Sequence, residues 1–498
     1  MARSTKLSGQ KTPPEEPAES LLETILDDVI KTATMPFKGW LALSPSPFVP
    51  LAIPVESGGR YSVSQAGVDA AHKLTQQAWQ AREDLRQTLT RDEFDRLSFT
   101  AIGETVLHSP ARLPETVDDP SKSLVDDAFL AVLADDYRAN VNRLADQTRP
   151  SVDRHIPCHL FHGDQAVPAF SVGPVEFRPR TDWLDSFVIN PHERARIREV
   201  ETGALRFEDL RQQAFAPGSA RELFNAWEVL SALRGFEWVA TVRMVGHALT
   251  QSHRKAPIIV GLAIDAIGLR FQVEDARRFT KAGRQHLFSE DRMATSPTGV
   301  FLRGSSVQMP GLGGKPGSLA AKVAAERPFL DAAGRVLDAY VICRQTGRAP
   351  HLVERWANAL YWVGEARREA SDFMAVVNYG CAADGLSGAG GEAREMIDFA
   401  VAALNPTSKP ALPDALSVED AVTNVYREGR NKLVHGETPG LFEDLADTRA
   451  IGDALLVNLF DVVTVELANV ISSGSAILTV GEKHAYRAFL TRLGQRSP

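Results

Sequence analysis

The C-terminal third of this chain constrains its fold most strongly, because long amphipathic segments follow one another there with only short breaks. Apolar residues recur at helical spacing near 328–345, 350–384, 391–404, 418–435, 441–472 and 480–494. Stretches that contain Gly or Pro separate several of these segments, at 385–391, 406–413 and 436–440. Long helices joined by short loops are typical of an antiparallel bundle, so we expect residues 326–498 to form one.

The chain before this bundle changes character along its length. Residues 1–20 are polar and contain Pro without any periodicity, so we expect a disordered tail. Residues 21–149 place apolar residues at helical spacing, which predicts a mainly helical region. The clearest helices are expected at 21–32, 68–89 and 124–145, and the Pro-, Ser- and Gly-rich stretch 44–59 is expected to be loop or extended chain.

Residues 150–325 mix strand and helix patterns, and we expect a recognition or sensor domain of mixed α/β structure there. β-Branched and aromatic residues in 165–180 predict two strands, with a turn at Gly173-Pro174. A helix is expected at 220–245, and the strand pattern returns at 258–273. The predicted fold class is therefore α+β and predominantly helical, a mixed α/β N-terminal region followed by a C-terminal antiparallel helical bundle.

The composition excludes several classes of protein. With 498 residues, of which 44% are hydrophobic and 24% charged, the chain is too long for one core and too apolar to be mainly disordered or collagen-like. Its three cysteines, Cys158, Cys343 and Cys381, exclude a disulfide framework and suit a reducing compartment. The first residues lack the apolar segment of a secretory signal, and acidic residues interrupt the longest apolar run, 455–471. We therefore expect a cytoplasmic protein without a membrane partner.

Charge is distributed unevenly along the chain. The net charge of −8 does not favour a nucleic-acid partner. Between Arg243 and Lys322, however, 12 basic residues stand against 5 acidic ones, so this stretch carries +7. Clustered Lys and Arg can follow a phosphate backbone, and Arg277, Arg278 and Lys281 lie near the centre of the stretch. A solvated surface with its charges spread around it explains the pattern equally well.

Four potential metal ligands lie close together in the sequence, at His155, Cys158, His159 and His162. Zinc prefers Cys and His at short spacings, but the sequence offers no second pair of ligands at a suitable distance. In a strand, His155 and His159 would share one face while Cys158 and His162 would take the other. We therefore expect a half-buried strand with surface histidines here, and neither a metal nor another cofactor.

The sharpest local feature is the helix that ends in residues 426–436. Ser417 and Asp420 form a capping pattern at its start, and Gly436 stands where a C-cap glycine belongs. Apolar residues along the segment form a stripe that would hold the helix against its neighbours. At about 100° per residue, Asn431 and His435 lie on nearly the same face of an α-helix.

Arg430 stands five positions before His435, which places it about 140° away around an α-helix, on the same broad face. Arg430 can hold a phosphate and stabilise the charge that builds up on it. His435 titrates near neutrality and can transfer a proton, and Asn431 can orient the imidazole or a ribose oxygen. These residue types suit work on a phosphodiester. Basic residues also favour the dipole at a helix end, so spacing alone leaves a purely structural role open.

The segment Arg430-Asn431-Lys432-Leu433-Val434-His435 resembles the R-x(4–6)-H signature of the HEPN superfamily, with a polar residue directly after the Arg. The longer string from Tyr426 to Glu437 is similar to the Apea-like HEPN subgroup. Residues 373–386 resemble the earlier core helix of the family, and Asp384 stands where an acidic residue, usually Glu, is found. The resemblance covers residues 326–498.

This resemblance implies a metal-independent endoribonuclease. Family members commonly dimerise through the bundle, so that two R-x4-H motifs form one composite cleft in which 2′-hydroxyl attack leaves a 2′,3′-cyclic phosphate. The resemblance assigns proton transfer to His435, transition-state charge to Arg430, orientation to Asn431, and support of Arg430 or His435 to Asp384. The residues then expected to contact RNA are Arg427, Lys432, Arg277, Arg278 and Lys281.

The expected partners follow from the same resemblance. They are RNA, with tRNA among the candidates, and further copies of this chain in a homodimer or higher homo-oligomer built through the C-terminal bundle. The family context implies bacterial anti-phage defence by abortive infection, with a phage-derived trigger. Some HEPN proteins are non-catalytic, so the alternative function is an RNA- or nucleotide-binding and dimerisation module.

Overall fold

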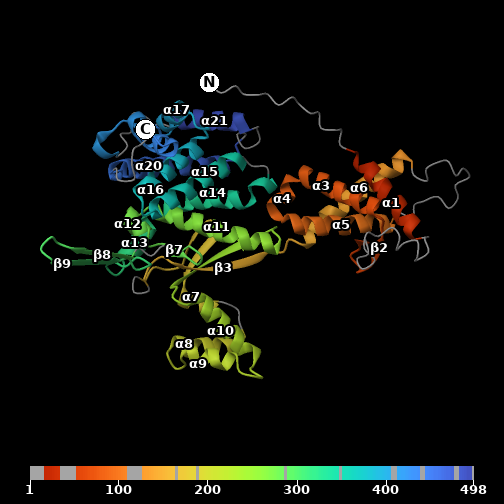
Figure 1. The fold of residues 1–498 in the computed structure, drawn as a ribbon, viewed down its shortest axis with the longest axis horizontal. Helices are drawn as coiled ribbons and strands as arrows, with labels where there is room; N and C mark the ends of the chain where they lie inside the picture. The colour runs from red at the N-terminus through yellow and green to blue at the C-terminus, as the bar shows by residue number, and fades with distance from the viewer. Residues whose placement is uncertain are drawn as a thin grey trace, which may run out of the picture. The chain divides into compact units, whose positions relative to one another are not determined.

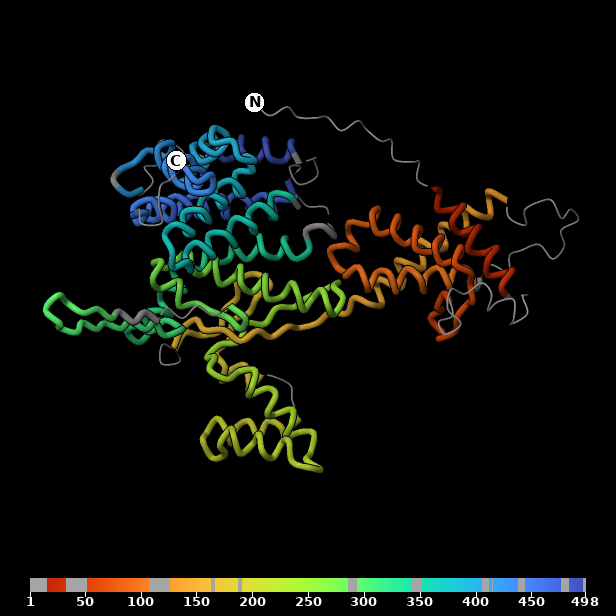
Figure 2. Tube along the Cα trace, in the orientation of Figure 1, coloured from red at the N-terminus to blue at the C-terminus, as the bar shows by residue number. Residues whose placement is uncertain are grey.

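The structure is a computed structural model, and it describes residues 16–33, 52–108, 126–162, 166–186, 190–284, 289–346, 350–404, 412–437, 444–475 and 482–495. It is mostly helical with small antiparallel sheets, which confirms the predicted α+β, predominantly helical class. The chain forms two compact units, Met1–Val152 with Val245–Ser252, and Asp153–Met244 with His253–Pro498. Figure 1 and Figure 2 follow the chain from red at the N-terminus to blue at the C-terminus.

Helices build most of the first unit. Its elements are α1 (Ala18–Ala33), β1 (Ala52–Pro54), β2 (Arg60–Ser62), α3 (Gln65–Ala81), α4 (Glu83–Thr88), α5 (Arg91–His108) and α6 (Asp127–Gln147). Apolar side chains of α1, α3, α5 and α6 form one core. Inside it, Ser98 Oγ lies 2.8 Å from Thr75 Oγ1 and 2.7 Å from Tyr137 Oη. These buried hydroxyls therefore satisfy one another, as buried polar groups must.

The helix predictions for this unit are confirmed in part. Those at 21–32 and 124–145 correspond to α1 and α6, whereas the one at 68–89 is two helices, α3 and α4, because the backbone leaves helical geometry at Arg82. Helix α5 was not predicted, since its charged first half obscures the apolar spacing. Of the predicted tail, residues 1–15 lie outside the described residues, as does most of the predicted loop at 44–59.

A five-stranded sheet belongs to the second unit. Its strands are β3 (Val152–His159), β4 (Phe170–Val172), β5 (Val175–Pro179), β6 (Trp238–Met244) and β7 (Thr280–Lys281). They lie in the order β4-β5-β6-β3-β7, with antiparallel pairing of β4 with β5, β5 with β6 and β3 with β7. The two strands predicted in 165–180 are thus confirmed. Gly173 in their turn has a φ of +57°, a conformation that favours glycine.

Two predictions for this region are wrong. The residues expected as strand at 258–273 form helix α11 (Leu249–Gly268) and the short helix α12 (Val273–Ala276). Every residue from Ile259 to Ile267 is buried, and a short apolar run does not distinguish a buried helix from a strand. The helix expected at 220–245 ends early, as α10 (Arg221–Leu233), and the chain then returns as β6.

Two further parts of this unit were not expected from the sequence. Helices α7 (Arg180–Ser186), α8 (Pro191–Glu201) and α9 (Phe207–Ala214) pack with α10 around a small core of their own. Strands β8 (Ser289–Thr295) and β9 (Phe301–Val307) form an antiparallel hairpin, in which Thr295 lies opposite Phe301. All residues of β9 are exposed.

The rest of the second unit is a helical array. Its elements are α13 (Ser318–Ala325), α14 (Arg327–Thr346), α15 (Pro350–Arg368), α16 (Asp372–Ser387), α17 (Ala393–Leu404), the 3-10 turn η3 (Pro413–Ala415), α18 (Val418–Val422), the π-helix η4 (Thr423–Asn431), α19 (Lys432–His435), α20 (Ala446–Ser472) and α21 (Glu482–Gly494). The single helix predicted at 350–384 is two helices, because Ser371 caps the start of α16. Parts of the loops predicted at 406–413 and 436–440 lie outside the described residues.

One hydrophobic core runs through the sheet, α11 and the helical array. Figure 1 shows α11 between the sheet and α14. The predicted domain boundary between residues 325 and 326 therefore falls inside a single core. Within the described chain, only α20 is long and apolar enough to cross a membrane, and half of its most apolar stretch is buried in the protein.

Candidate functional site

The helix that carries the R-x4-H motif begins and ends as its sequence predicts. Ser417 Oγ accepts a hydrogen bond from the backbone N–H of Asp420 at 3.1 Å, and Gly436 ends the helix with a φ of +71°. Between these caps, residues 423–431 form a π-helix. Such wide turns are rare and are frequently found at functional sites. They also change which side chains share a face, so the angles of an ideal α-helix do not hold between Arg430 and its neighbours.

Two glycines bring the motif helix close to α16. A Cβ atom on Gly380 would lie 2.5 Å from Arg430 Cβ and 2.7 Å from Arg430 Cγ, so the side-chain stem of Arg430 rests directly on the α16 backbone. Gly429 is equally restricted, since a Cβ atom there would lie 2.7 Å from Val376 Cγ1. Packing thus fixes the first part of the Arg430 side chain.

The guanidinium of Arg430 lacks an ionic partner in the described part of the chain. Its Nη1 donates a hydrogen bond to Asn431 Oδ1 at 2.8 Å, and its Cζ lies 5.4 Å from the centroid of the Tyr426 ring. Its Nε is buried, and no acceptor among the described residues reaches it. A half-buried cation without a carboxylate partner remains available to an anion.

Asp384 supports this arrangement indirectly. Its Oδ1 accepts a hydrogen bond from the backbone N–H of Gly391 at 3.0 Å, and the Gly391 carbonyl accepts one from Tyr426 Oη at 3.1 Å. Burial raises the pKa of Tyr426, and the negative charge of Asp384 raises it further, so the phenol stays protonated and donates. The resemblance predicts that Asp384 contacts Arg430 or His435 directly. Among the described residues, no hydrogen bond or ion pair joins Asp384 to either side chain.

His435 lies in the last turn of the helix and is exposed. Its neighbour Val434 is also exposed, by 52%. No hydrogen bond joins His435 to Arg430 within the described residues of one chain. The motif therefore presents an accessible imidazole and a positioned guanidinium, with no hydrogen bond between them in the described part of one chain.

The other predicted RNA contacts are divided between the surface and the interior. Arg427 is exposed, and Lys432 forms an ion pair with Glu428 on the outer side of the motif helix. Arg277, in contrast, donates from Nε to the Arg367 carbonyl at 2.7 Å, and Lys281 is buried. Burial lowers the pKa of both side chains. Arg278 binds the carbonyl of Met309 at 3.0 Å.

Other cations of the +7 stretch are also used inside the protein. Arg284 Nη2 lies 3.2 Å from Asp265 Oδ2 and 2.6 Å from Glu365 Oε1, and Arg368 Nη1 lies 2.5 Å from Asp265 Oδ1. Arg270 pairs with Glu326 at 2.7 Å. The stretch is therefore not one basic face, because several of its cations balance acidic groups, some within the stretch, such as Asp265, and some outside it, such as Glu326 and Glu365.

The His/Cys cluster lies on and beside β3, in the predicted strand. Cys158 is in the core, and burial raises the pKa of its thiol. His159 packs against Phe236 with ring centroids 4.7 Å apart, and His155 accepts from Trp183 Nε1 at 3.2 Å. Burial lowers the pKa of both histidines. Among the described residues, no three His, Cys, Asp or Glu side chains are grouped to hold a metal ion.

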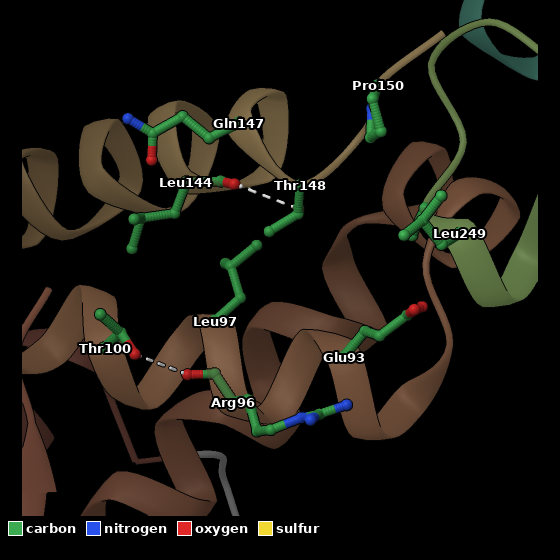
Figure 3. A pocket seen from close by; sticks show the side chains of 10 residues that line it. Glu93, Arg96, Leu97, Thr100, Leu144, Gln147, Thr148, Pro150 and Leu249 are labelled. Carbon is green, nitrogen blue, oxygen red and sulfur yellow. Dashed lines mark hydrogen bonds between the residues drawn. The ribbon is translucent and has the colours of Figure 1, made fainter. Parts of the chain in front are cut away.

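A cavity of about 540 Å³ in the first unit offers a different kind of site (Figure 3). It lies between α5 and α6, and its lining is mainly apolar, with Leu97 and Leu144 facing it. Its carboxylate, Glu93, belongs to a capping box, since Glu93 Oε2 accepts from the Thr90 N–H at 2.8 Å and Thr90 Oγ1 accepts from the Glu93 N–H at 3.2 Å. Glu93 therefore has a structural role.

Comparison of the chain with protein-family models, with curated proteins and with solved structures gives no match. The geometry of the motif helix is thus the main support for a function. Sequence reasoning identified Arg430, Asn431 and His435, but it missed Gly380 and Gly391, which position the guanidinium and the Tyr426 hydroxyl. The available signal was the excess of Gly in 380–391, where the sequence predicts a loop that contains Gly391 but places Gly380 within the helix 350–384.

Proposed function

We propose that this protein is a metal-independent endoribonuclease whose C-terminal helical array is of the HEPN type. The observation that carries the proposal is the state of Arg430. Packing on Gly380 and the Tyr426 ring holds its side chain, yet no carboxylate of the described chain neutralises it. A positioned, uncompensated guanidinium on the same helix as an exposed imidazole suits a phosphodiester substrate, because the phosphate supplies the missing negative charge.

The reaction is a transesterification within RNA. The ribose 2′-oxygen forms a bond to the adjacent phosphorus, and the bond from phosphorus to the 5′-oxygen of the next nucleotide breaks. The 2′-hydroxyl loses its proton and the departing 5′-oxygen gains one, so no net proton is consumed. His435 transfers protons, and Arg430 stabilises the charge on the phosphoryl oxygens. Asn431, which accepts from Arg430 Nη1, keeps the guanidinium oriented.

A second copy of the chain completes the site in this proposal. No hydrogen bond joins Arg430 to His435 within the described residues of one chain, and the reaction needs two proton transfers. Two motifs that face each other would supply two imidazoles and two guanidinium groups to one cleft. The exposed apolar side chain of Val434 beside His435 suits a surface that another chain covers. We expect a homodimer, or a higher homo-oligomer, built through the C-terminal helices.

The test is cleavage of RNA by the full-length protein in the presence of EDTA, with a tRNA mixture as substrate. We expect products with 2′,3′-cyclic phosphate ends, and a rate that falls about 10²- to 10⁴-fold in His435→Ala. Arg430→Lys keeps the charge but not the planar fork, so it should also lose most activity. His192→Ala, which removes another exposed histidine, is the matched control and should cleave like the wild type.

Two results would overturn the assignment: cleavage that EDTA abolishes, or a His435→Ala variant as active as the wild type. The alternative, a non-catalytic HEPN-type module for RNA or nucleotide binding and dimerisation, requires RNA binding that depends on Arg430 without any cleavage. The biological setting rests on the family resemblance: a cytoplasmic effector of bacterial anti-phage defence that a phage-derived trigger activates. Its test is loss of protection in infected cells that express His435→Ala.

A further inference from the structure

One edge of strand β9 has no strand partner in the described part of the chain. Its sheet contains two strands, so β8 occupies one edge of β9 and leaves the other open. Figure 1 shows the hairpin of β8 and β9 extending away from the helices of its unit. All residues of β9 are exposed. The backbone groups on the open edge are therefore a template for another strand.

The usual features that prevent pairing at an edge are missing from β9. Proteins protect such edges with Pro, with β-bulges or with several charged residues. Within Phe301–Val307, Arg303 is the one charged residue and no Pro occurs, and the register with β8 continues from Thr295 opposite Phe301 to Ser289 opposite Val307 without a bulge. A hairpin of two strands is only marginally stable in water. A further strand on this edge would therefore stabilise the hairpin.

The turn of the hairpin indicates which residues direct their backbone groups outward. The Ser296 N–H donates a hydrogen bond to the Val300 carbonyl at 2.9 Å. Hydrogen-bonded and non-hydrogen-bonded pairs alternate along an antiparallel ladder. Counting from this bond, the residues of β9 that bond to β8 are the even-numbered ones. The odd-numbered residues direct their N–H and C=O groups to the open edge: Phe301, Arg303, Ser305 and Val307.

These outward groups are complementary to the same edge of a second copy of the chain. Two β9 strands related by a two-fold axis run antiparallel, and they bond where outward-directed residues lie opposite one another. With the axis at Gly304, all residues of β9 pair and each outward group gains a partner. Phe301 then lies opposite Val307 of the other copy, and Arg303 lies opposite Ser305. Apolar side chains thus meet apolar ones, and no like charges face each other.

Other registers are less favourable. A slip by two residues in one direction places the Arg303 side chains of the two copies directly opposite each other, where like charges are destabilising. A slip by two residues in the other direction leaves Phe301, which is 62% exposed, without an opposite residue in β9. A slip by one residue sets outward groups against groups that already bond to β8. The edge therefore specifies the register centred on Gly304.

We propose that β9 pairs with β9 of a second copy of this chain, giving a four-stranded antiparallel sheet in the order β8-β9-β9-β8. The exposed apolar side chains of Phe301 and Val307 lie on one face of the hairpin and contact each other across the axis. In the sequence of the outer strand β8, three of seven residues are charged, which disfavours addition of further strands. The pairing therefore closes at two copies.

Nucleic acid is a less suitable partner for this hairpin. A two-stranded ribbon can enter the major groove of DNA, and binding there depends on positive charge. Residues 289–307, however, include two basic and two acidic residues, so their net charge is zero. The edge is also separate in sequence from the C-terminal helices, and the proposal does not rest on the proposed ribonuclease activity.

Disulfide cross-linking of the full-length protein tests the pairing. The two Gly304 Cα atoms would be about 4.5 Å apart, a separation that a disulfide can bridge. A Cβ atom on Gly304 meets nothing within 4 Å, so Gly304→Cys should fold normally. With oxidised glutathione, we expect most of this variant to shift to twice the monomer mass on a non-reducing gel and to return after reduction. The wild type, which has three cysteines, sets the background.

Leu302→Cys is the matched control for the register. It changes an exposed residue of the same strand, but the two Leu302 Cα atoms would be about 14 Å apart, too far for a disulfide. Leu302→Cys/Ser306→Cys should cross-link again, because these positions lie opposite each other. In Gly304→Cys/Ser305→Pro, the Pro removes an outward N–H but none of the bonds to β8, so cross-linking should be lost.

Two results would overturn the proposal. The first is a Gly304→Cys variant that cross-links no more than the wild type, which would assign the open edge to a different partner. The second is equal cross-linking of Leu302→Cys and Gly304→Cys, which would indicate random collision and not a defined register. A dimer formed only through the C-terminal helices gives the first result. Because no RNA is present, neither result depends on whether the protein is a ribonuclease.

Discussion

The guanidinium of Arg430 lies over the ring of Tyr426, 5.4 Å from its centroid, and the hydroxyl of the same tyrosine is bonded to the carbonyl of Gly391. Tyr426 therefore connects the cation of the motif to the turn that ends α16. Its ring is buried, so neither contact moves freely. Support for Arg430 thus comes from its own helix, from the α16 backbone at Gly380 and from the turn at Gly391, the last two being about 40 to 50 residues earlier in the sequence.

Substitutions of Tyr426 should separate its two contacts. Tyr426→Phe keeps the ring under Arg430 but loses the 3.1 Å hydrogen bond to Gly391, so the free energy of unfolding should fall by about 1 kcal/mol while RNA cleavage persists. Tyr426→Leu also removes the aromatic face and should reduce cleavage further. Urea denaturation and RNA cleavage, measured on the same preparations, check both statements. Equal cleavage rates in the two variants would contradict a role for the ring.

Gly380→Ala should displace Arg430. The added methyl group would lie 2.5 Å from Arg430 Cβ, so the two helices must separate, which should cost about 1–3 kcal/mol of folding free energy. Cleavage should fall by more than the loss of folded protein explains, because the guanidinium moves with its stem. Gly304→Ala is a suitable control, since an added Cβ atom there meets nothing within 4 Å. Unchanged stability and activity in Gly380→Ala would contradict the close packing.

Asp265→Ala should be among the most destabilising single substitutions in the second unit. Asp265 is buried between the guanidinium groups of Arg284 and Arg368, at 3.2 Å and 2.5 Å. Removal of the carboxylate leaves both cations without this partner, which should lower the free energy of unfolding by about 3–5 kcal/mol. Chemical denaturation measures the change. Arg138→Ala, which breaks the exposed ion pair between Arg138 and Asp135, serves as the reference. A smaller loss of unfolding free energy in Asp265→Ala than in Arg138→Ala would contradict the stabilising role of Asp265.

The stability of this ion-pair cluster should depend on pH in a defined direction. Burial raises the pKa of Asp265 from 3.8 to about 6, although Arg284 lowers it in part. Because the folded-state pKa lies above the unfolded-state value, the folded protein binds a proton more readily between these two pH values. The contribution of Asp265 to the free energy of unfolding should therefore fall as pH rises through this window, and stay constant above it.

Comparison with Asp265→Asn isolates this effect, since the amide does not titrate. The quantity to compare is the free energy of unfolding of the wild type minus that of Asp265→Asn. This difference should decrease as the pH rises from 3.8, the unfolded-state pKa of Asp265, to about 6, its folded-state pKa. It should then level off at neutral pH. Urea denaturation across a pH series gives this difference directly. A difference that grows with pH across the window would show that the pKa of Asp265 is lowered instead.

Local sequence patterns predicted the elements whose signals are local. The Ser417 cap, the Gly436 stop and the apolar stripe between them placed the motif helix correctly, and Gly173-Pro174 marked the turn between β4 and β5. The same patterns failed at α11. There the run from Ile259 to Ile267 is buried on every side, so it has no polar face to reveal its period.

By itself the sequence determined which chemical groups the motif offers, because Arg430, Asn431 and His435 lie on one short helix with recognisable ends. Only the tertiary structure decided what these groups can do. It left Arg430 without an ionic partner in the described chain, and it turned Lys281 and Arg284 of the basic stretch inward. The physical reason is that ion pairing and burial depend on residues such as Gly380, Asp265 and Glu365, which approach only when distant helices pack.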